Sequence, residues 1–369
     1  ALYFLAAGLA ATAIARVLQS PPAGVAYLLF VGANPELVKY CFTVLSEAPS
    51  LAGAMLLLAA AARAVDGRAS GFVAMGLIAA VAIDLRPVNW SWVPLIPLAA
   101  LLARAGWRAG FAGLAAVVVP LVALSLARPP AADADRRDFA ALNLFGKFAL
   151  LVEVPRDAFE ADVAEQTRAM RDRLDATDDF GVAFGLRAAY AEHLRYGEWR
   201  DFAARALPAP ETRLDKVLAL AAARPAAFVA EIARQLRGFW TMPDLIDARE
   251  RGAREAALAA LPDSPLRAIE TPPAARPTAV VWGTRAILAI GFALSLALMA
   301  AAPYPGAAWA FAGLAAFALW GNWTLVAALH TALPRYALGA WPFLGVCLAA
   351  AIAATHRIWR SRRPRGTRP

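Results

Sequence analysis

Nine apolar runs, separated by short polar or basic stretches, constrain this sequence more than any other feature. The chain is 60% hydrophobic, whereas soluble domains are closer to half apolar, so it needs a solvent other than water. Several runs are shorter than the ~20 residues that a helix needs to cross a bilayer, so we expect tilt, extension into the flanks or a re-entrant course. The predicted spans are residues 2–18, 24–42, 50–64, 71–85, 89–103, 110–127, 278–302, 307–328 and 336–355.

Between residues 128 and 277 the character of the sequence changes, because charges become frequent and no run is suited to span a membrane. Helical periodicity replaces continuous apolarity there, as over 161–174 and 213–220. We therefore predict an all-α, polytopic transmembrane protein of about nine spans with an extracytoplasmic helical insert. The predicted parts are N-terminal spans over 1–127, the insert over 128–277, C-terminal spans over 278–356 and a basic cytoplasmic tail over 357–369.

The basic residues fit this alternation of spans. The positive-inside rule assigns one face to the cytoplasm, and that face carries Arg16, Arg63, Arg68, Arg104, Arg108 and the tail. Glu47, Arg86, the insert and residues 330–335 then lie on the opposite, extracytoplasmic face. For the tail we expect anionic lipid headgroups, rather than nucleic acid, as the partner.

The sequence begins at Ala1, inside an apolar run and without an initiator methionine. Residues 2–18 are long enough to span and lack a small-residue cleavage context, so a cleaved signal peptide is not expected. We therefore expect a fragment or processed chain whose N-terminal portion is missing.

Glu47 is the first candidate for a functional group, because charges at membrane depth are costly and usually face a cavity, a partner or a substrate. It precedes Pro49 at the outer mouth between two spans. One interpretation makes it a metal ligand or an acceptor contact. The other is a helix N-terminal carboxylate favoured by the helix dipole, with Pro49 in the first turn.

Arg86 lies at the outer end of the next apolar run, between Asp84 and Pro87. An arginine at a helix end, followed by a proline that frees backbone amides, suits a phosphate. The alternatives are an Asp84–Arg86 contact or a snorkelling side chain. The nearby Trp90 and Trp92 are predicted to be an interfacial aromatic belt, and stacking on a sugar ring is the second interpretation.

Four further polar residues are candidates on the same face: Lys147, His330, Arg335 and Tyr336. Arg335 could pair with a phosphate or with Glu47, and snorkelling is the alternative. His330 alone is more often a structural interface histidine than a base. Lys147 could meet an anionic headgroup or substrate, although a solvated surface lysine is the simpler expectation.

Several motifs that would identify a chemistry are absent from the sequence. It has no phosphate-cradling glycine-rich loop, H-E-x-x-H, paired C-x-x-C or G-x-S-x-G. His193 and the acids of the insert lack metal-ligand spacing. The residues alone therefore predict a polytopic membrane protein with a charged site on its outer face.

Short motifs spread along the chain resemble those of the multispanning GT-C glycosyltransferases, in the group of protein mannosyltransferases and aminoarabinose transferases related to glycosyltransferase family 39. The motifs are Asn34-Pro35 followed by Leu45-Ser46-Glu47, the stretch from Gly76 to Arg86-Pro87, Arg224-Pro225 followed by Phe228 and Trp240, and Pro334-Arg335-Tyr336 followed by Pro342. Asp84 departs from the group, which more often has a small or hydroxyl residue there. The group's catalytic acid would lie upstream of Ala1, so the catalytic residues stay unknown.

The resemblance implies transfer of a sugar from a polyprenyl-phosphate donor to an acceptor on the extracytoplasmic face of a bacterial inner membrane. It implies that Arg86, Arg335 and Lys147 bind the phosphate. Glu47 would orient the acceptor or hold a divalent metal ion, the one cofactor expected. Contacts to sugar or acceptor would come from Asp84, Trp90, His330 and Tyr336. The expected partners are membrane lipids, the lipid-linked donor and an acceptor that the sequence does not identify.

Two other classes of function stay open. An O-antigen ligase or polymerase also uses polyprenyl-linked sugars and outer-face arginines. A transporter or flippase would need ionisable residues near the bilayer midplane, for which Arg285 and Lys39 are the candidates, and an internal repeat, which is not visible. A non-catalytic scaffold is the remaining alternative.

Overall fold

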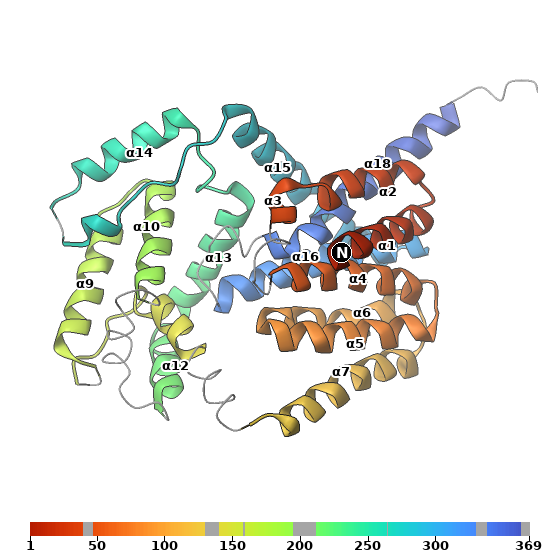
Figure 1. Cartoon of the computed structure of the whole chain (residues 1–369), viewed down its shortest axis with the longest axis horizontal. Helices are drawn as coiled ribbons and strands as arrows, with labels where there is room; N and C mark the ends of the chain where they lie inside the picture. The colour runs from red at the N-terminus through yellow and green to blue at the C-terminus, as the bar shows by residue number, and fades with distance from the viewer. Residues whose placement is uncertain are drawn as a thin grey trace, which may run out of the picture. The chain divides into compact units, whose positions relative to one another are not determined.

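The computed structural model describes residues 1–39, 47–129, 140–157, 159–194, 212–263, 265–329 and 338–362. Every regular element in these ranges is a helix, which agrees with the predicted all-α class (Figure 1). The chain forms two compact units. Unit 1 comprises residues 1–127, 290–323 and 337–369, and unit 2 comprises 128–289 and 324–336.

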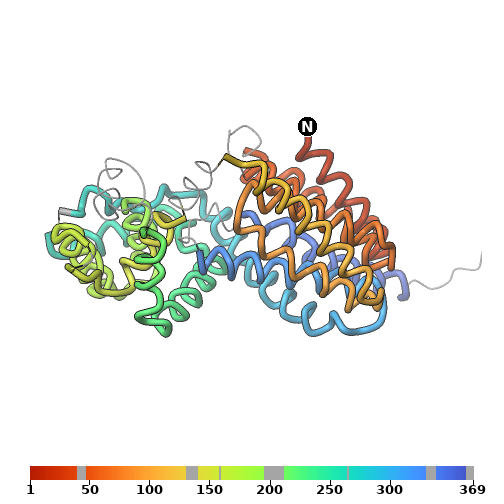
Figure 2. The backbone as a smooth tube through the Cα atoms, turned by 90° about the horizontal axis from the view of Figure 1, so that it is seen from below, coloured from red at the N-terminus to blue at the C-terminus, as the bar shows by residue number. Residues whose placement is uncertain are grey.

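Unit 1 is a bundle of apolar helices that run side by side (Figure 2). Its N-terminal elements are α1 (Leu2–Val17), α2 (Pro21–Tyr27), the π-helical turn η1 (Leu28–Gly32), α3 (Pro35–Val38), α4 (Glu47–Val65), α5 (Ala69–Leu85), the 3-10 helix η3 (Pro87–Trp92), α6 (Leu95–Leu102) and α7 (Trp107–Ala127). Its C-terminal elements are parts of α15 (Thr278–Ala301) and α16 (Ala307–Leu329), then the 3-10 turn η6 (Leu338–Ala340) and α18 (Trp341–Arg362).

Small residues set the spacing of these helices. A Cβ added at Gly76 of α5 would lie 2.1 Å from the carbonyl oxygen of Gly113 in α7, so the two backbones are in contact there. Close approach through small residues is typical of helix packing in membranes, where apolar side chains gain little by avoiding lipid. Gly67, at φ +78°, ends the α4 helix and allows the short turn into α5.

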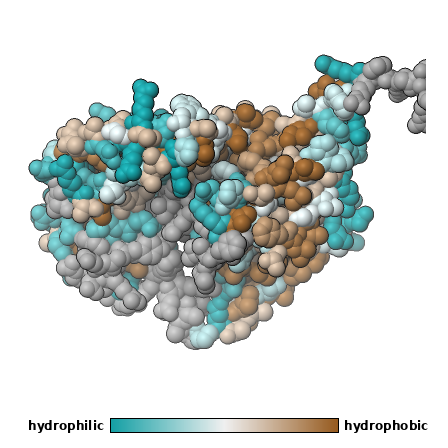
Figure 3. All heavy atoms as spheres, turned by 45° about the horizontal axis from the view of Figure 1, so that its top comes forward, coloured by the Kyte–Doolittle hydropathy of each residue, from teal (hydrophilic) through white to brown (hydrophobic). Residues whose placement is uncertain are grey.

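The described residues include five helices that are long and apolar enough to cross a membrane: α4, α7, α15, α16 and the segment Leu338–Arg362. These indicate an integral membrane protein. Four shorter apolar helices overlap four other predicted spans: Leu2–Val17, Pro21–Gly32, Ala69–Leu85 and Pro87–Leu102. The second of them covers only the first half of the predicted span 24–42, because the helix ends at Gly32 before α3. Figure 3 shows hydrophobic side chains gathered over the visible face of unit 1, while the visible face of unit 2 is largely hydrophilic. The count of nine spans stays a prediction.

Unit 2 is a helical domain with its own hydrophobic core. Its elements are a helix over residues 140–148, α9 (Ala161–Asp175), α10 (Phe180–His193), α12 (Arg213–Ala223), α13 (Pro225–Thr241), α14 (Ala248–Ala260) and η5 (Pro265–Ile269), with the first turns of α15 and the end of α16. Asp179 caps α10 by accepting a 2.8 Å hydrogen bond from the Val182 amide. Asp247 and Glu250 form a capping box on α14. Aromatic residues such as Phe145, Phe148 and Tyr190 fill the core.

A buried ion pair ties the segment after α14 to this core. Arg173 donates to both carboxylate oxygens of Glu270, at 2.9 and 2.8 Å, and the Tyr190 hydroxyl donates to the same carboxylate at 2.6 Å. Burial would raise the pKa of Glu270, but the hydrogen bonds from Arg173 and Tyr190 lower it. Every group in this cluster is satisfied, which identifies it as a structural clasp.

Candidate functional site

Glu47 and Arg86 are brought together at one end of the α4–α5 hairpin in unit 1. Glu47 lies in the first turn of α4, and Arg86 directly follows the last residue of α5. The turn over 66–68 joins the two helices, so groups at their far ends meet. Arg86 Nη1 lies 3.9 Å from Glu47 Oε1, and both side chains are only 10–12% exposed.

This ion pair leaves part of the carboxylate unused. Glu47 Oε2 is buried and has no hydrogen-bond partner among the described residues. A buried carboxylate oxygen without a donor is costly, because it has lost water and gained nothing in exchange. The pair therefore has the capacity to accept a further hydrogen bond or a cation. Glu47 also lies where the α4 dipole favours an anion, so the helix-terminus interpretation holds as well.

A second pair of residues, which sequence reasoning missed, fixes the geometry of the first. Ser50 lies three residues after Glu47, and Asn89 lies three residues after Arg86. Asn89 Nδ2 is 3.1 Å from Ser50 Oγ and donates a 2.8 Å hydrogen bond to the Ala82 carbonyl. Both side chains are buried. This crosslink holds the start of α4 against the end of α5. The sequence contains one signal for it, because Ser50 and Asn89 each lie three residues after a charged site residue.

Other buried polar groups surround η3, the 3-10 helix that follows Arg86. Asn322 of α16 donates to Ser91 Oγ at 3.4 Å. Asn322 Oδ1 and Trp92 Nε1 are buried and have no hydrogen-bond partners among the described residues. The bundle interior around η3 thus holds one acceptor and one donor that have no partner among the described residues.

The two tryptophans of η3 differ from each other. Trp90 is 51% exposed, as an aromatic belt or a sugar platform requires. Trp92 is fully buried, and its ring packs edge-on against Phe343 of α18 with ring centres 6.1 Å apart. The prediction that Trp92 belongs to an interfacial belt is therefore wrong, because its ring lies inside the bundle, next to Gly53 of α4 and Phe343 of α18.

Lys147 lies in unit 2, on the helix over 140–148, and the expectation of a solvated surface lysine is wrong for it. It is 2% exposed, and its Nζ donates a hydrogen bond to the Ala327 carbonyl near the end of α16. The last carbonyls of a helix lack intrahelical donors, which explains why a cation is accepted there. Burial lowers the pKa of Lys147 to about 8, against the opposing effect of Glu231.

The other predicted site residues fall into two groups. Asp84 is partly buried in the last turn of α5, near Arg86 along the chain. His330, Arg335 and Tyr336 lie outside the described residues. Among the described residues no group of three or more His, Cys, Asp or Glu side chains could hold a metal ion, so a divalent ion at Glu47 stays a prediction.

Comparison with known proteins adds nothing to this geometry. No family model matches the chain, and searches among curated proteins and among solved structures found no match. The resemblance carried by the short motifs therefore stays a prediction, and the candidate site has to be argued from its own residues.

Proposed function

We propose that this protein is a membrane glycosyltransferase of GT-C type that moves a sugar from a polyprenyl-phosphate donor to an acceptor on the extracytoplasmic face. The observation that carries the proposal is the buried Glu47–Arg86 pair at the ends of two apolar helices, with one carboxylate oxygen that has no donor in the part of the chain that the structure describes. The buried pair of Arg173 and Glu270 differs, because both oxygens of its carboxylate accept hydrogen bonds.

Arg86 would serve the leaving group. In the transfer, the bond between the anomeric carbon and the phosphate oxygen breaks, and a bond to the acceptor oxygen forms. Negative charge then develops on the lipid phosphate, and a fixed guanidinium stabilises it without reorganisation. Arg86 is only 12% exposed, so its interaction with that charge is weakly screened.

Glu47 would orient the acceptor. Its unpartnered Oε2 can accept a hydrogen bond from the attacking hydroxyl, whose proton passes to a base that the present chain does not identify. If a divalent ion binds at Glu47, it would supply further positive charge for the phosphate. The exposed ring of Trp90 provides a surface on which a sugar ring can stack.

The proposed topology has nine spans in a bacterial inner membrane, with residues 128–277 on the extracytoplasmic side. It is supported by the alternation of arginines in the sequence and by the five long and four shorter apolar helices. In this arrangement unit 2 faces the acceptor, and Lys147 is one of its buried cations. Membrane lipids surround unit 1.

A transporter or flippase has less support from the described contacts. Arg285 pairs with Glu250 of the polar helix α14 at 2.7 Å and donates to the Leu245 carbonyl at 3.1 Å, so it is not a lone charge among apolar helices. Lys39 pairs with Glu36 on the surface. Neither residue fits an unpaired midplane site.

The experiment is a transfer assay in membranes from cells that express the complete reading frame, with radiolabelled polyprenyl-phosphate sugars as donors. Label should reach an acceptor, and Glu47→Gln and Arg86→Ala should each lower the rate by about 10²–10³-fold, as loss of a transition-state contact does. Protein levels and membrane insertion should stay normal.

Matched controls come from exposed residues of the same unit. Glu36→Gln removes a surface carboxylate, and Arg68→Ala removes an exposed arginine from the opposite end of the hairpin. Both should transfer label at the wild-type rate. Near-normal transfer by Glu47→Gln and Arg86→Ala, or no transfer from any polyprenyl-linked donor, would contradict the proposal.

A further inference from the structure

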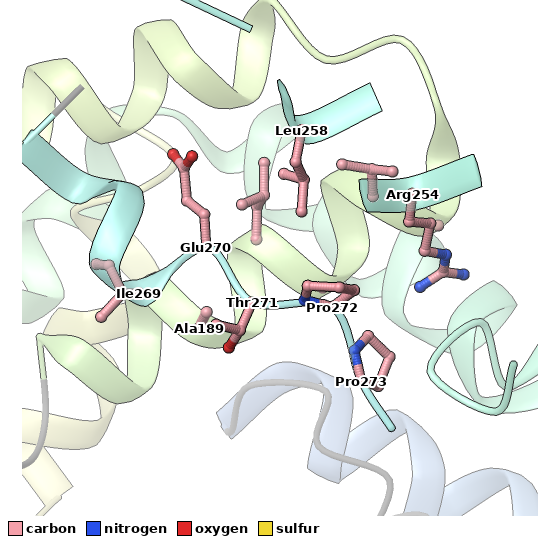
Figure 4. Close-up of a pocket in the computed structure, with 12 residues that line it drawn as sticks. Ala189, Arg254, Leu258, Ile269, Glu270, Thr271, Pro272 and Pro273 are labelled. Atoms are coloured by element: carbon pink, nitrogen blue, oxygen red, sulfur yellow. The ribbon is translucent and has the colours of Figure 1, made fainter. Parts of the chain in front are cut away.

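Unit 2 contains a cavity of about 480 Å³ that the proposed transferase site does not use. It is open to one side and is lined by the start of α10, the end of α13, the α14 helix and the first turns of α15, all within unit 2. Small-molecule sites in proteins occupy roughly 300–1,000 Å³, so this cavity is large enough for a ligand. An adjacent pocket of about 20 Å³ has room only for water (Figure 4).

Three arginines from three different helices line the large cavity: Arg237, Arg254 and Arg285. The two carboxylates in its wall are already engaged. Glu250 accepts from Arg285 at 2.7 and 3.2 Å and closes the capping box of α14, and Asp179 caps α10. Arg285 is therefore neutralised locally. Arg254 lies within the influence of the Asp244 and Asp179 carboxylates, and Arg237 adds positive charge without an ion-pair partner among the described residues.

Arg254 is held in place with unused hydrogen-bonding capacity. Its Nη2 donates to the Pro243 carbonyl, while Nη1 is buried and has no hydrogen-bond partner among the described residues. A Cβ at residue 181 would lie 2.3 Å from Nη2, so Gly181 is what makes room for the guanidinium. In Figure 4 this guanidinium points away from Glu270, which lies on the other side of the small pocket.

Arg237 is positioned by an aromatic ring instead of an acid. Its guanidinium carbon lies 4.0 Å from the centre of the Phe180 ring, and it forms no ion pair with any of the described residues. Contact with a ring uses the face of a guanidinium and leaves the N–H groups in its plane to bind an anion bidentately. Trp240 adds a second aromatic wall.

We propose that this cavity binds a phosphate-bearing headgroup, with Arg237 and Arg254 on the phosphate and the rings of Phe180 and Trp240 against its polyol or sugar. A membrane lipid is the source nearest to the cavity, because α15 is a candidate span and exposes Val280 and Trp282 beside Arg285. A soluble phosphorylated polyol has the same chemistry. The proposal does not rest on the transferase activity.

The test uses the full chain in nanodiscs and two probes. Glycerol 3-phosphate is titrated by calorimetry into protein in phosphatidylcholine discs, with glycerol as the uncharged control. In parallel, the unfolding midpoint is compared between phosphatidylcholine discs and discs with equal parts of phosphatidylglycerol. We expect the wild-type protein to bind glycerol 3-phosphate or to unfold at a higher midpoint in the phosphatidylglycerol discs. Arg237→Gln and Arg254→Gln should each raise the dissociation constant about tenfold or more and reduce the midpoint shift, because each removes a charge-assisted hydrogen bond.

The matched control is Arg251→Gln, on the same helix as Arg254 but paired with Glu255 on the surface. It should leave both readouts unchanged. If Arg254→Gln fails to fold, the exposed Arg237 carries the test alone. An effect of phosphatidylglycerol alone assigns the site to a lipid, and binding of glycerol 3-phosphate in phosphatidylcholine discs assigns it to a soluble ligand. Wild-type protein that responds to neither probe, or an Arg237→Gln variant that responds like wild type, would overturn the proposal.

Discussion

Two of the buried glutamates with arginine partners, Glu270 in unit 2 and Glu47 in unit 1, are built differently. Glu270 receives two hydrogen bonds from Arg173 and one from Tyr190, all at 2.6–2.9 Å. Glu47 lies 3.9 Å from Arg86 and leaves one oxygen without a donor among the described residues. The first arrangement satisfies the whole carboxylate, whereas the second leaves hydrogen-bonding capacity that we propose serves a ligand.

Breaking the Glu270 clasp should have the largest effect on stability. Glu270→Gln leaves Arg173 buried without a counter-charge and should lower the unfolding free energy of unit 2 by roughly 3–5 kcal/mol. Hydrogen exchange or limited proteolysis of residues in α9 and α10 would measure the loss. Asp263→Asn, at an exposed pair with Arg267, should cause no measurable change. A small effect of Glu270→Gln would remove the contrast between the two pairs.

The buried Lys147 predicts a pH dependence of the same unit. Its pKa in the fold is about 8, whereas an unfolded lysine titrates near 10.4, so the unfolded state binds more protons between these values. Stability should therefore rise with pH over this window, by up to about 3 kcal/mol in total. Lys147→Met should remove that rise, and Lys216→Met should retain it. A pH profile identical in wild type and Lys147→Met would contradict the burial argument.

Loss of the Ser50–Asn89 crosslink beside Glu47 should lower the unfolding free energy by less than the changes above, because the crosslink joins neutral groups. Ser50→Ala should cost about 1 kcal/mol, and Asn89→Ala should cost somewhat more, because the Ala82 carbonyl also loses its donor. Denaturation in mild detergent would measure both. Thr12→Ala, which removes only an exposed bond within α1, is the control. If Asn89→Ala is as stable as that control, Asn89 does not fix the site.

The smallest effect on stability should come from Glu47 itself. Glu47→Gln removes a long ion pair and a partly uncompensated charge, and Arg86 keeps the favourable field at the C-terminal end of α5. Removing the buried charge also removes its desolvation penalty, which offsets the loss of a contact as long as 3.9 Å, so we expect the unfolding free energy in the same detergent to change by less than about 1 kcal/mol. A loss as large as that for Glu270→Gln would make Glu47–Arg86 a second structural clasp.

Continuous apolarity and turn position made much of unit 1 predictable. Helices α15 and α16 begin at the predicted residues 278 and 307, because apolar helix formers follow proline and glycine breaks there. Glu47 and Arg86 could be expected at one end because the hairpin turn lies about midway between them. The structure confirms the all-helical class and the presence of helices suited to span a membrane. The roles of Glu47 and Arg86 stay predictions.

Contacts between distant parts of the chain could not be predicted. Lys147 finds its acceptor at Ala327, and Arg173 finds Glu270, over separations that leave no periodic trace in a single sequence. Trp92 was misassigned because its neighbours in sequence do not reveal that Phe343 covers it. The cavity arginines were missed for the same reason, since each comes from a different helix.

Ligand-induced stabilisation tests the central claim, that Glu47 and Arg86 serve a ligand and not the fold, most directly. The unfolding midpoint of the protein in micelles is measured with and without a polyprenyl phosphate, since a ligand that binds the folded state stabilises it by mass action. We expect a clear rise for wild type and for Arg68→Ala, and no rise for Arg86→Ala. An equal rise for Arg86→Ala, or none for wild type, would contradict the account.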